Sequence, residues 1–178
     1  MLYAFGFERL GVVVSDLYFV DPRPTPGEEG PEQGVRLELR LLERGALRGS
    51  IYSAQPIEVD RPIWRVDLLE SVSASGSFDR THHHPKFRGW EPGRRNYVPD
   101  LSADPLGWLG QRLNDLPGLL ADAQLDPAEL APTDEDALKR AVPEILAAVE
   151  KLLAGVRAGD LGQPPAEGDL ESARASWL

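Results

Sequence analysis

Strict alternation of apolar and polar residues is the dominant pattern in the first 70 positions. It is clearest over residues 35–41, where alternate apolar side chains share one face: Val35, Leu37, Leu39 and Leu41. Charged residues take the opposite face: Arg36, Glu38 and Arg40. A period of two is typical of a β-strand with one buried face. We therefore predict a half-buried strand here.

Further strands are predicted on both sides of this one. Residues 2–20 are rich in aromatic and β-branched side chains and predict two strands or one bent pair. Residues 51–59 and 63–70 predict two more, with Trp64, Val66 and Leu68 on one face of the latter. Residues 21–31 hold four prolines and two glycines, which predicts an exposed loop. Consecutive strands joined by short connections favour an antiparallel meander.

The apolar period changes to that of a helix near residue 100. Asp104 and Pro105 predict an N-cap and a first helical position, before leucines spaced three and four apart: Leu106, Leu109, Leu113 and Leu116. A longer helix is predicted from the cap at 133–136 to about residue 157, kinked or divided by Pro143. The fold class is therefore α+β: an antiparallel β meander in the N-terminal half, followed by C-terminal helices packed on one face. We expect a single domain over 1–158 and an extended or disordered tail over 159–178.

Composition narrows the classes of function. The chain has 178 residues and a net charge of −10, which is unevenly distributed. Residues 1–99 carry 13 basic and 14 acidic side chains, net −1, whereas residues 100–178 carry 6 and 15, net −9. Nucleic acid would thus be confined to a local basic region. The absence of cysteine excludes disulfides and thiolate chemistry. No apolar run is long enough for a membrane span, so we expect a cytoplasmic protein without membrane contact.

The three histidines of the chain are consecutive, at positions 82–84. In an extended segment His82 and His84 share one face and His83 takes the other. Such a pair can bind a divalent metal or divide acid and base roles, and Asp79 is near enough to orient one imidazole. The catalytic candidates are therefore His82, His83, His84 and Asp79. The alternative is a solvated turn, closed by Pro85, in which the imidazoles hydrogen-bond to backbone carbonyls.

Basic and aromatic residues surround the histidines. The candidates for substrate or partner binding are Arg80, Lys86, Arg88, Trp90, Arg94, Arg95 and Tyr97. Guanidinium groups suit phosphates and aromatic faces suit bases, so the mixture favours single-stranded RNA. The alternative is a long loop whose arginines pair with the protein's own carboxylates. In an antiparallel sheet Arg65 and Asp67 would lie on the face to which Asp79 and the histidines could fold back, and the sequence leaves that pairing open.

Residues 78–85, Phe-Asp-Arg-Thr-His-His-His-Pro, resemble the signature of the small bacterial toxins of the TumE type, an aromatic-Asp-Asn-Ala-Pro-His-His-Pro run after an antiparallel sheet. Five positions agree: Phe78, Asp79, His83, His84 and Pro85. Arg80, Thr81 and His82 depart from it, and the second histidine cluster of that family is missing. The resemblance implies an RNA-cleaving toxin that works with an antitoxin, or a non-catalytic relative.

Two functions therefore remain open. The first is metal-independent RNA cleavage, with His82 and His84 as the acid–base pair by their shared face, or His83 and His84 by the resemblance. The second is a non-catalytic interaction protein that binds an antitoxin or another protein through the aromatic and arginine-rich segment. We expect no cofactor, and weak or absent metal binding, because Asp79 is the only carboxylate near the histidines in the sequence.

Overall fold

The computed structural model describes residues 1–20 and 30–164. Five strands form one antiparallel sheet in chain order. They are β1 (Leu2–Gly6), β2 (Leu10–Val20), β3 (Pro31–Arg44), β4 (Ile57–Ser71) and β5 (His82–His84). A short hairpin follows, made of β6 (Phe87–Arg88) and β7 (Glu91–Pro92). The predicted α+β class and antiparallel meander are confirmed.

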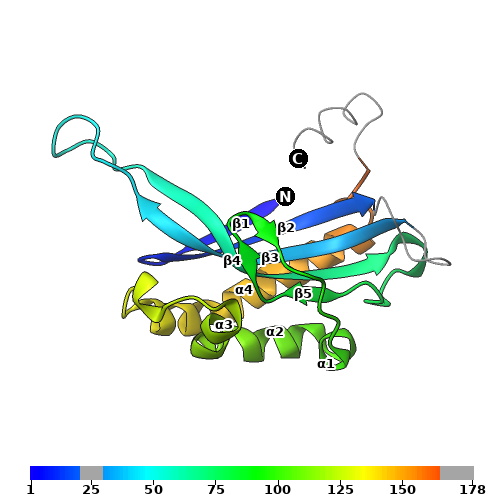
Figure 1. Ribbon diagram of the computed structural model, residues 1–178. Coiled ribbons are helices and arrows are strands. Elements are labelled where there is room, and N and C mark those ends of the chain that lie inside the picture. The colour runs from blue at the N-terminus through cyan, green and yellow to red at the C-terminus, as the bar shows by residue number, and fades with distance from the viewer. Residues whose placement is uncertain (21–29, 165–178) are drawn as a thin grey trace.

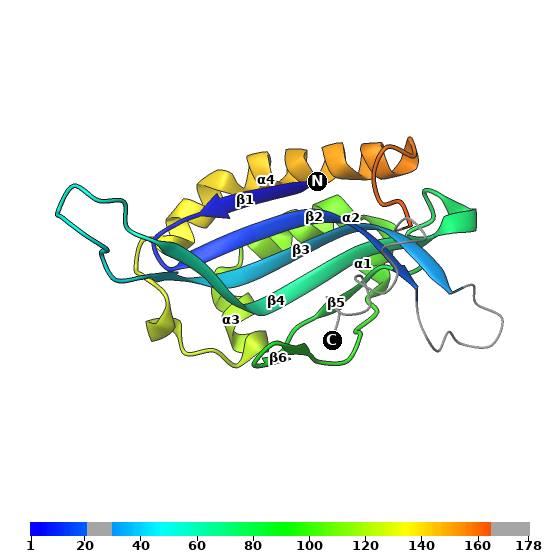
Figure 2. The same cartoon turned by 90° about the horizontal axis from the view of Figure 1, so that it is seen from above.

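Helices cover one face of the sheet (Figures 1 and 2). They are α1 (Pro99–Ala103), α2 (Pro105–Leu113), α3 (Leu116–Ala123) and α4 (Asp134–Arg157), with 3₁₀ turns η1 (Val72–Ala74) and η2 (Pro127–Glu129). Asp104 caps α2 as predicted, because its carboxylate accepts the Gly107 N–H at 3.0 Å. The helix α4 continues through Pro143 undivided. Within the described residues no helix is long and apolar enough to cross a membrane.

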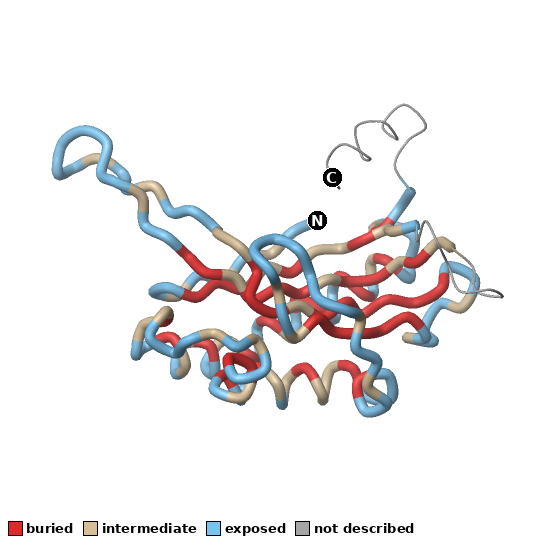
Figure 3. The backbone as a smooth tube through the Cα atoms, in the orientation of Figure 1, coloured by how far each residue is buried: buried red, intermediate tan, exposed pale blue. Residues whose placement is uncertain are grey.

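The core lies between the helices and the alternate apolar positions of the central strands. Leu37 and Leu39 of β3 and Val66 of β4 are fully buried, as is Ile145 of α4. Figure 3 shows this burial as a red layer along the sheet and the inner sides of the helices. The predicted faces of these strands are therefore confirmed, and burial of this apolar area is the main source of stability.

The strand boundaries differ from the prediction at β3 and β4. The strand β3 begins at Pro31, and the two strands predicted over 51–59 and 63–70 are the single strand β4. Pro62 lacks an N–H, and the ladder with β3 responds by shifting register near Arg40 without ending. Ile51 and Tyr52 instead lie exposed in the β3–β4 connection.

Two other predictions concern the loop and the tail. Of the predicted loop over 21–31, residues 21–29 lie outside the described residues. Of the predicted tail, residues 165–178 do so as well, while Leu161 packs against the core and Gly162 donates its N–H to Asp16 at 2.9 Å.

The face of the sheet away from the helices carries the charged residues of β3 and β4. In Figure 1 the β6–β7 hairpin rises on this side of the sheet, while the helices lie beneath. The strand β5 pairs with β4 at the sheet edge, and two residues, Pro85 and Lys86, separate β5 from the hairpin. The fold therefore places the histidine strand between the helices on one side and residues 85–97, the basic segment, on the other.

Candidate functional site

The strand β5 consists of the three histidines themselves. Its register with β4 pairs Asp67 with His82 and Arg65 with His84, while His83 pairs with Val66. Because side chains alternate across a strand, His82 and His84 lie on the charged face and His83 lies on the helix side. The predicted shared face of His82 and His84 is confirmed. The alternative of a solvated turn is wrong, because all three histidines are buried in a strand, but its hydrogen bonds from imidazoles to backbone carbonyls are present for His82 and His84.

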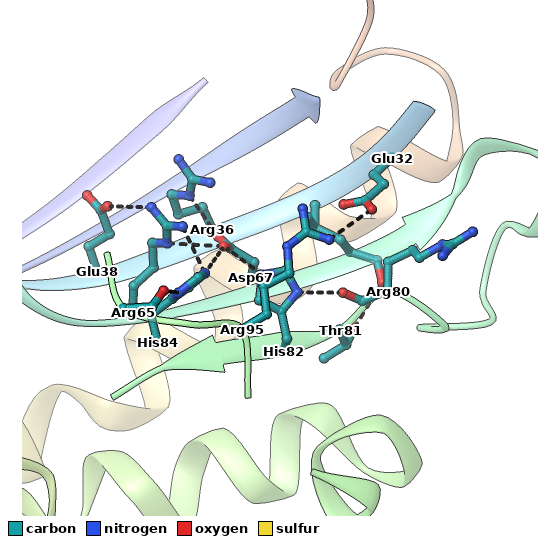
Figure 4. A network of polar contacts seen from close by, with 12 residues as sticks. Glu32, Arg36, Glu38, Arg65, Asp67, Arg80, Thr81, His82, His84 and Arg95 are labelled. Carbon is teal, nitrogen blue, oxygen red and sulfur yellow. Dashed lines mark hydrogen bonds and ion pairs between the residues drawn. The ribbon is translucent and has the colours of Figure 1, made fainter. Parts of the chain in front are cut away.

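The carboxylate beside the imidazoles is that of Asp67 (Figure 4). Its Oδ2 lies 3.4 Å from Nε2 of His82 and 3.5 Å from Nε2 of His84. Only 1% of Asp67 is exposed, as is 1% of His82. The three side chains thus bring one oxygen and two nitrogens together in a site closed to solvent.

Backbone carbonyls fix the orientation of both rings. Nδ1 of His82 lies 2.7 Å from the Arg80 carbonyl oxygen, and Nδ1 of His84 lies 2.7 Å from that of Gly93. A carbonyl only accepts, so Nδ1 carries the proton and donates in both residues. Each Nε2 is then directed toward Asp67, and the ring centroids are 5.0 Å apart. The Arg80 carbonyl belongs to the connection between β4 and β5, and the Gly93 carbonyl belongs to the basic segment. These two segments therefore set the orientation of the rings.

Two arginines hold the Asp67 carboxylate. Arg36 Nε donates to Oδ1 at 2.7 Å, and Arg65 Nε lies 3.1 Å from Oδ2. Burial by itself raises the pKa of this carboxyl, but the positive charge of Arg36, with that of Arg65, outweighs burial and holds the pKa well below its ordinary value. Asp67 is therefore a buried carboxylate anion.

Arg65 also contacts His84 directly. Its Nη2 lies 2.9 Å from His84 Nε2, which accepts this hydrogen bond because its proton is on Nδ1. Burial lowers the pKa of His84, and the positive charge of Arg65 lowers it further, while Asp67 opposes the shift. His84 is thus a neutral imidazole whose Nε2 lone pair faces a cation.

Asp79, the carboxylate predicted to orient an imidazole, serves a different purpose. It accepts hydrogen bonds from the Ser71 N–H at 2.8 Å and from the Ser71 and Ser77 hydroxyls. It also forms an ion pair with Arg80 at 3.4 Å. These contacts hold the connection between β4 and β5, and the imidazoles contact Asp67 instead. The predicted role of Asp79 is therefore corrected: it shapes the approach to β5.

His83 lies among aromatic residues on the helix side. Its ring centroid is 6.1 Å from that of Trp64 and 5.2 Å from that of Trp108. Asn96 donates its side-chain N–H to Nε2 at 2.9 Å. Burial first, and then the charge of Arg112, lower the pKa of His83 to about 4. The structure therefore separates His83 from the other two histidines.

The predicted binding residues fall into two groups. Arg80 and Arg95 are engaged internally: Arg80 Nε donates to the Ser71 hydroxyl at 3.0 Å, and Arg95 donates to Glu32 at 3.1 Å. The others are exposed: Lys86, Arg88, Trp90, Arg94 and Tyr97. The alternative of arginines paired with internal carboxylates thus holds for Arg95. The exposed group is available to a ligand.

The basic segment of residues 85–97 lies directly against the histidine strand. The Tyr97 ring centroid is 5.5 Å from that of His82, and the backbones of His83 and Asn96 form a β-bridge. A pocket of about 370 Å³ opens within the segment; it is lined by Pro85, Lys86, Gly93, Arg94, Arg95 and Asn96. Gly93 therefore borders the pocket and also orients His84.

Sequence reasoning left the charged partners of the imidazoles unassigned. These are Asp67 and Arg65 of β4, which contact the imidazoles, while Arg36 and Glu38 of β3 contact Asp67 and Arg65 in turn. The available signal was the alternation of β4, which placed Arg65 and Asp67 on one face with the same two-residue spacing as His82 and His84. No family model, curated protein or solved structure matches this chain. The resemblance to TumE-type toxins stays a prediction.

Proposed function

We propose that the protein binds single-stranded RNA along the basic segment and cleaves it with the imidazoles of His82 and His84. The observation that carries this proposal is the position of Gly93. Its carbonyl orients His84 at 2.7 Å, and the same residue lines the pocket that contains Lys86 and Arg94. A phosphate bound to these cations would lie on the same segment that orients His84.

The chemistry follows from the shared face and the orientation of the two rings. Neutral His84 has a lone pair on Nε2 and removes the proton of the ribose 2′-OH. The 2′-oxygen then attacks phosphorus, and His82 acts as the general acid that gives a proton to the departing 5′-oxygen. The products are a 2′,3′-cyclic phosphate and a free 5′-OH. Arg65, beside His84, stabilises the negative charge that develops on the phosphorane.

Access to this pair requires movement of the segment above it. His82 and His84 are only 1% and 4% exposed. The β6–β7 hairpin that follows β5 has two residues in each strand, and most of its residues are exposed. Short exposed segments open at low free-energy cost, so RNA binding to the segment can be coupled to its displacement.

The test is cleavage of labelled single-stranded RNA in EDTA at about pH 5 to 8, the titration range of histidine. His82→Ala and His84→Ala are each expected to lower the rate by at least about 100-fold, the usual contribution of a general acid or base. Asp79→Asn is the matched control and should cut at the wild-type rate. Intact RNA with wild-type protein, or unchanged cleavage by the double histidine variant, would refute the proposal.

Binding of a protein partner is the second candidate, and exposed aromatic residues favour it. Trp90 is 59% exposed and lies over the Arg40 guanidinium, and Tyr97 is 56% exposed. Tryptophan, tyrosine and arginine are enriched in binding hot spots. If RNA stays intact, retention of a partner on immobilised wild-type protein and its loss with Trp90→Ser would support this function.

A further inference from the structure

The spacing of the three converging atoms is unusual for a hydrogen-bonded cluster. Asp67 Oδ2 lies 3.4 and 3.5 Å from the two Nε2 atoms, beyond the ordinary range for N–H···O bonds. A tetrahedral cation bound at about 2.1 Å places its ligand atoms about 3.4 Å apart. The two Asp67–imidazole separations match the edges of such a coordination sphere, and all three ligand atoms lie within 4.8 Å of one another.

The surroundings of these atoms also suit a metal. Imidazoles that bind metals through Nε2 usually donate Nδ1–H to a carbonyl or carboxylate, and the carbonyls of Arg80 and Gly93 accept these bonds here. Arg36 takes the other carboxylate oxygen, Oδ1, and leaves Oδ2 directed at the imidazoles. The ligand atoms are therefore held in place by groups that a cation would not displace.

Arg65 holds the position that the cation would take. Its Nη2 contacts His84 Nε2 at 2.9 Å, and its Nε lies 3.1 Å from Asp67 Oδ2. That Nε is buried, and its N–H forms no hydrogen bond, so the fit of the guanidinium is incomplete. A second carboxylate is close, because Arg65 Nη1 is 3.9 Å from Glu38 Oε1. The guanidinium can turn toward Glu38 and vacate the site.

We propose that Asp67, His82 and His84 form a site for a divalent cation of the zinc class, which binds in exchange with the Arg65 guanidinium. Two imidazoles and one carboxylate are ligands that zinc accepts, and three protein ligands leave a fourth position open. The expectation of weak or absent metal binding rested on Asp79 as the nearby carboxylate. Asp67 supplies the ligand that the sequence did not reveal.

Occupation of this site has a consequence that rests on the proposed function. A cation bound to both Nε2 atoms takes the lone pairs with which His82 and His84 would move protons. Zinc is therefore an inhibitor of the metal-free RNA cleavage described above. The binding of the cation itself is independent of any activity on RNA.

The experiment is titration calorimetry of the purified chain with zinc, together with the visible spectrum after addition of cobalt(II), which reports tetrahedral geometry. One cation per chain is expected. His82→Gln and His84→Gln should each weaken binding by at least about tenfold. Arg65→Met should strengthen it by about tenfold or more, because the competing cation is gone. Asp79→Asn is the matched carboxylate control and should bind as wild type, and circular dichroism checks that every variant is folded.

Equal affinity in the wild type and the two histidine variants would overturn the proposal, as would absence of binding by both the wild type and Arg65→Met. Cleavage in EDTA by a protein that binds no zinc would leave the proposed function standing and this inference refuted. Zinc binding by a protein that leaves RNA intact would support this inference and refute the proposed function.

Discussion

Side chains are buried on both faces of the β4–β5 edge, but the two faces differ in the kinds of residue that they contain. On the helix side His83 packs with Trp64 and Trp108, and its one strong side-chain hydrogen bond comes from Asn96. On the other side Asp67 and two imidazoles are surrounded by arginines. Apolar burial stabilises the first face. Ion pairs must offset a large desolvation cost on the second.

This difference is the reason for placing the proposed chemistry on the charged face. Replacement of a buried ionic cluster by apolar side chains of similar volume often leaves the stability of a protein unchanged. A contribution to stability is therefore not a sufficient reason for a protein to have such a cluster. The imidazole on the helix side is held neutral by its surroundings, whereas those on the charged face converge on a carboxylate. Changes on either face should therefore have separable effects on stability and chemistry.

The largest effect is expected from a charge on the helix side. Leu39→Asp places a carboxylate at a fully buried position with no partner for it, which should cost about 5 kcal/mol or more and leave little folded protein. Urea unfolding followed by circular dichroism measures this. Glu43→Gln, at an exposed position of the same strand, is the control and should change stability far less. An unchanged unfolding midpoint for Leu39→Asp would mean that the faces of β3 are reversed.

The next effect concerns the carboxylate of the charged face. Asp67→Asn removes the anion between Arg36 and Arg65 and leaves two half-buried cations without it. Loss of one member of a buried ion pair costs about 3 kcal/mol or more. Asp79→Asn changes an exposed carboxylate in the connection between β4 and β5, and it should lower the free energy of unfolding much less. Thermal unfolding of both variants decides the matter, and equal losses would contradict the assignment of Asp67 as the central carboxylate.

A pH titration separates His83 from its neighbours. Its pKa is about 4 in the folded protein and near 6.5 when unfolded, so both states are neutral above pH 6.5. As pH falls from 6.5 to 4, the unfolded state takes up a proton and the folded state does not, and stability decreases. The loss from this residue reaches roughly 3 kcal/mol. Arg112 adds to the shift and Asp122 opposes it, while His82 and His84 contribute weakly.

His83→Gln is the variant that tests this pH dependence. Glutamine can still accept a hydrogen bond from Asn96 and does not titrate. The stability of the variant, measured by urea unfolding at a series of pH values, should fall less than that of the wild type over this window. Parallel curves for the two proteins would show that His83 titrates at its ordinary pKa.

Local patterns predicted the faces but not the partners. The alternation along β4 placed Arg65 and Asp67 together, and the H-x-H spacing placed His82 with His84. What joined the two pairs is the antiparallel pairing of β5 with β4 across the connection of residues 72–81. That pairing depends on contacts between distant segments, which a local period does not encode.

Each misassignment has a physical reason. Asp79 is close to the histidines in sequence, but serine hydroxyls and an N–H of the connection use its carboxylate. The two strands predicted over 51–59 and 63–70 were not separate, because a register shift accommodates Pro62 and β4 continues. For Asp79, proximity along the chain was a poorer guide than the hydrogen-bonding capacity of its neighbours.

The smallest effect is expected from a single exposed arginine of the basic segment. Arg94 lines the pocket beside Gly93, and in the proposed function it neutralises one phosphate. Loss of one such contact lowers the slope of log K against log salt by about 0.7 for single-stranded nucleic acid. Arg94→Ala should therefore bind RNA more weakly at low salt, with a shallower salt dependence, and leave stability unchanged.

Fluorescence anisotropy of labelled single-stranded RNA over a range of salt concentrations measures both quantities. Arg140→Ala is the matched control, because Arg140 is an exposed arginine of α4, on the helix side of the sheet. Both substitutions change the net charge of the chain by the same amount, so a general electrostatic effect would appear equally in both. A reduced slope in Arg94→Ala alone places the phosphate at the basic segment. Identical slopes in the two variants and the wild type would remove Arg94 from the binding surface and with it the route by which RNA reaches His84.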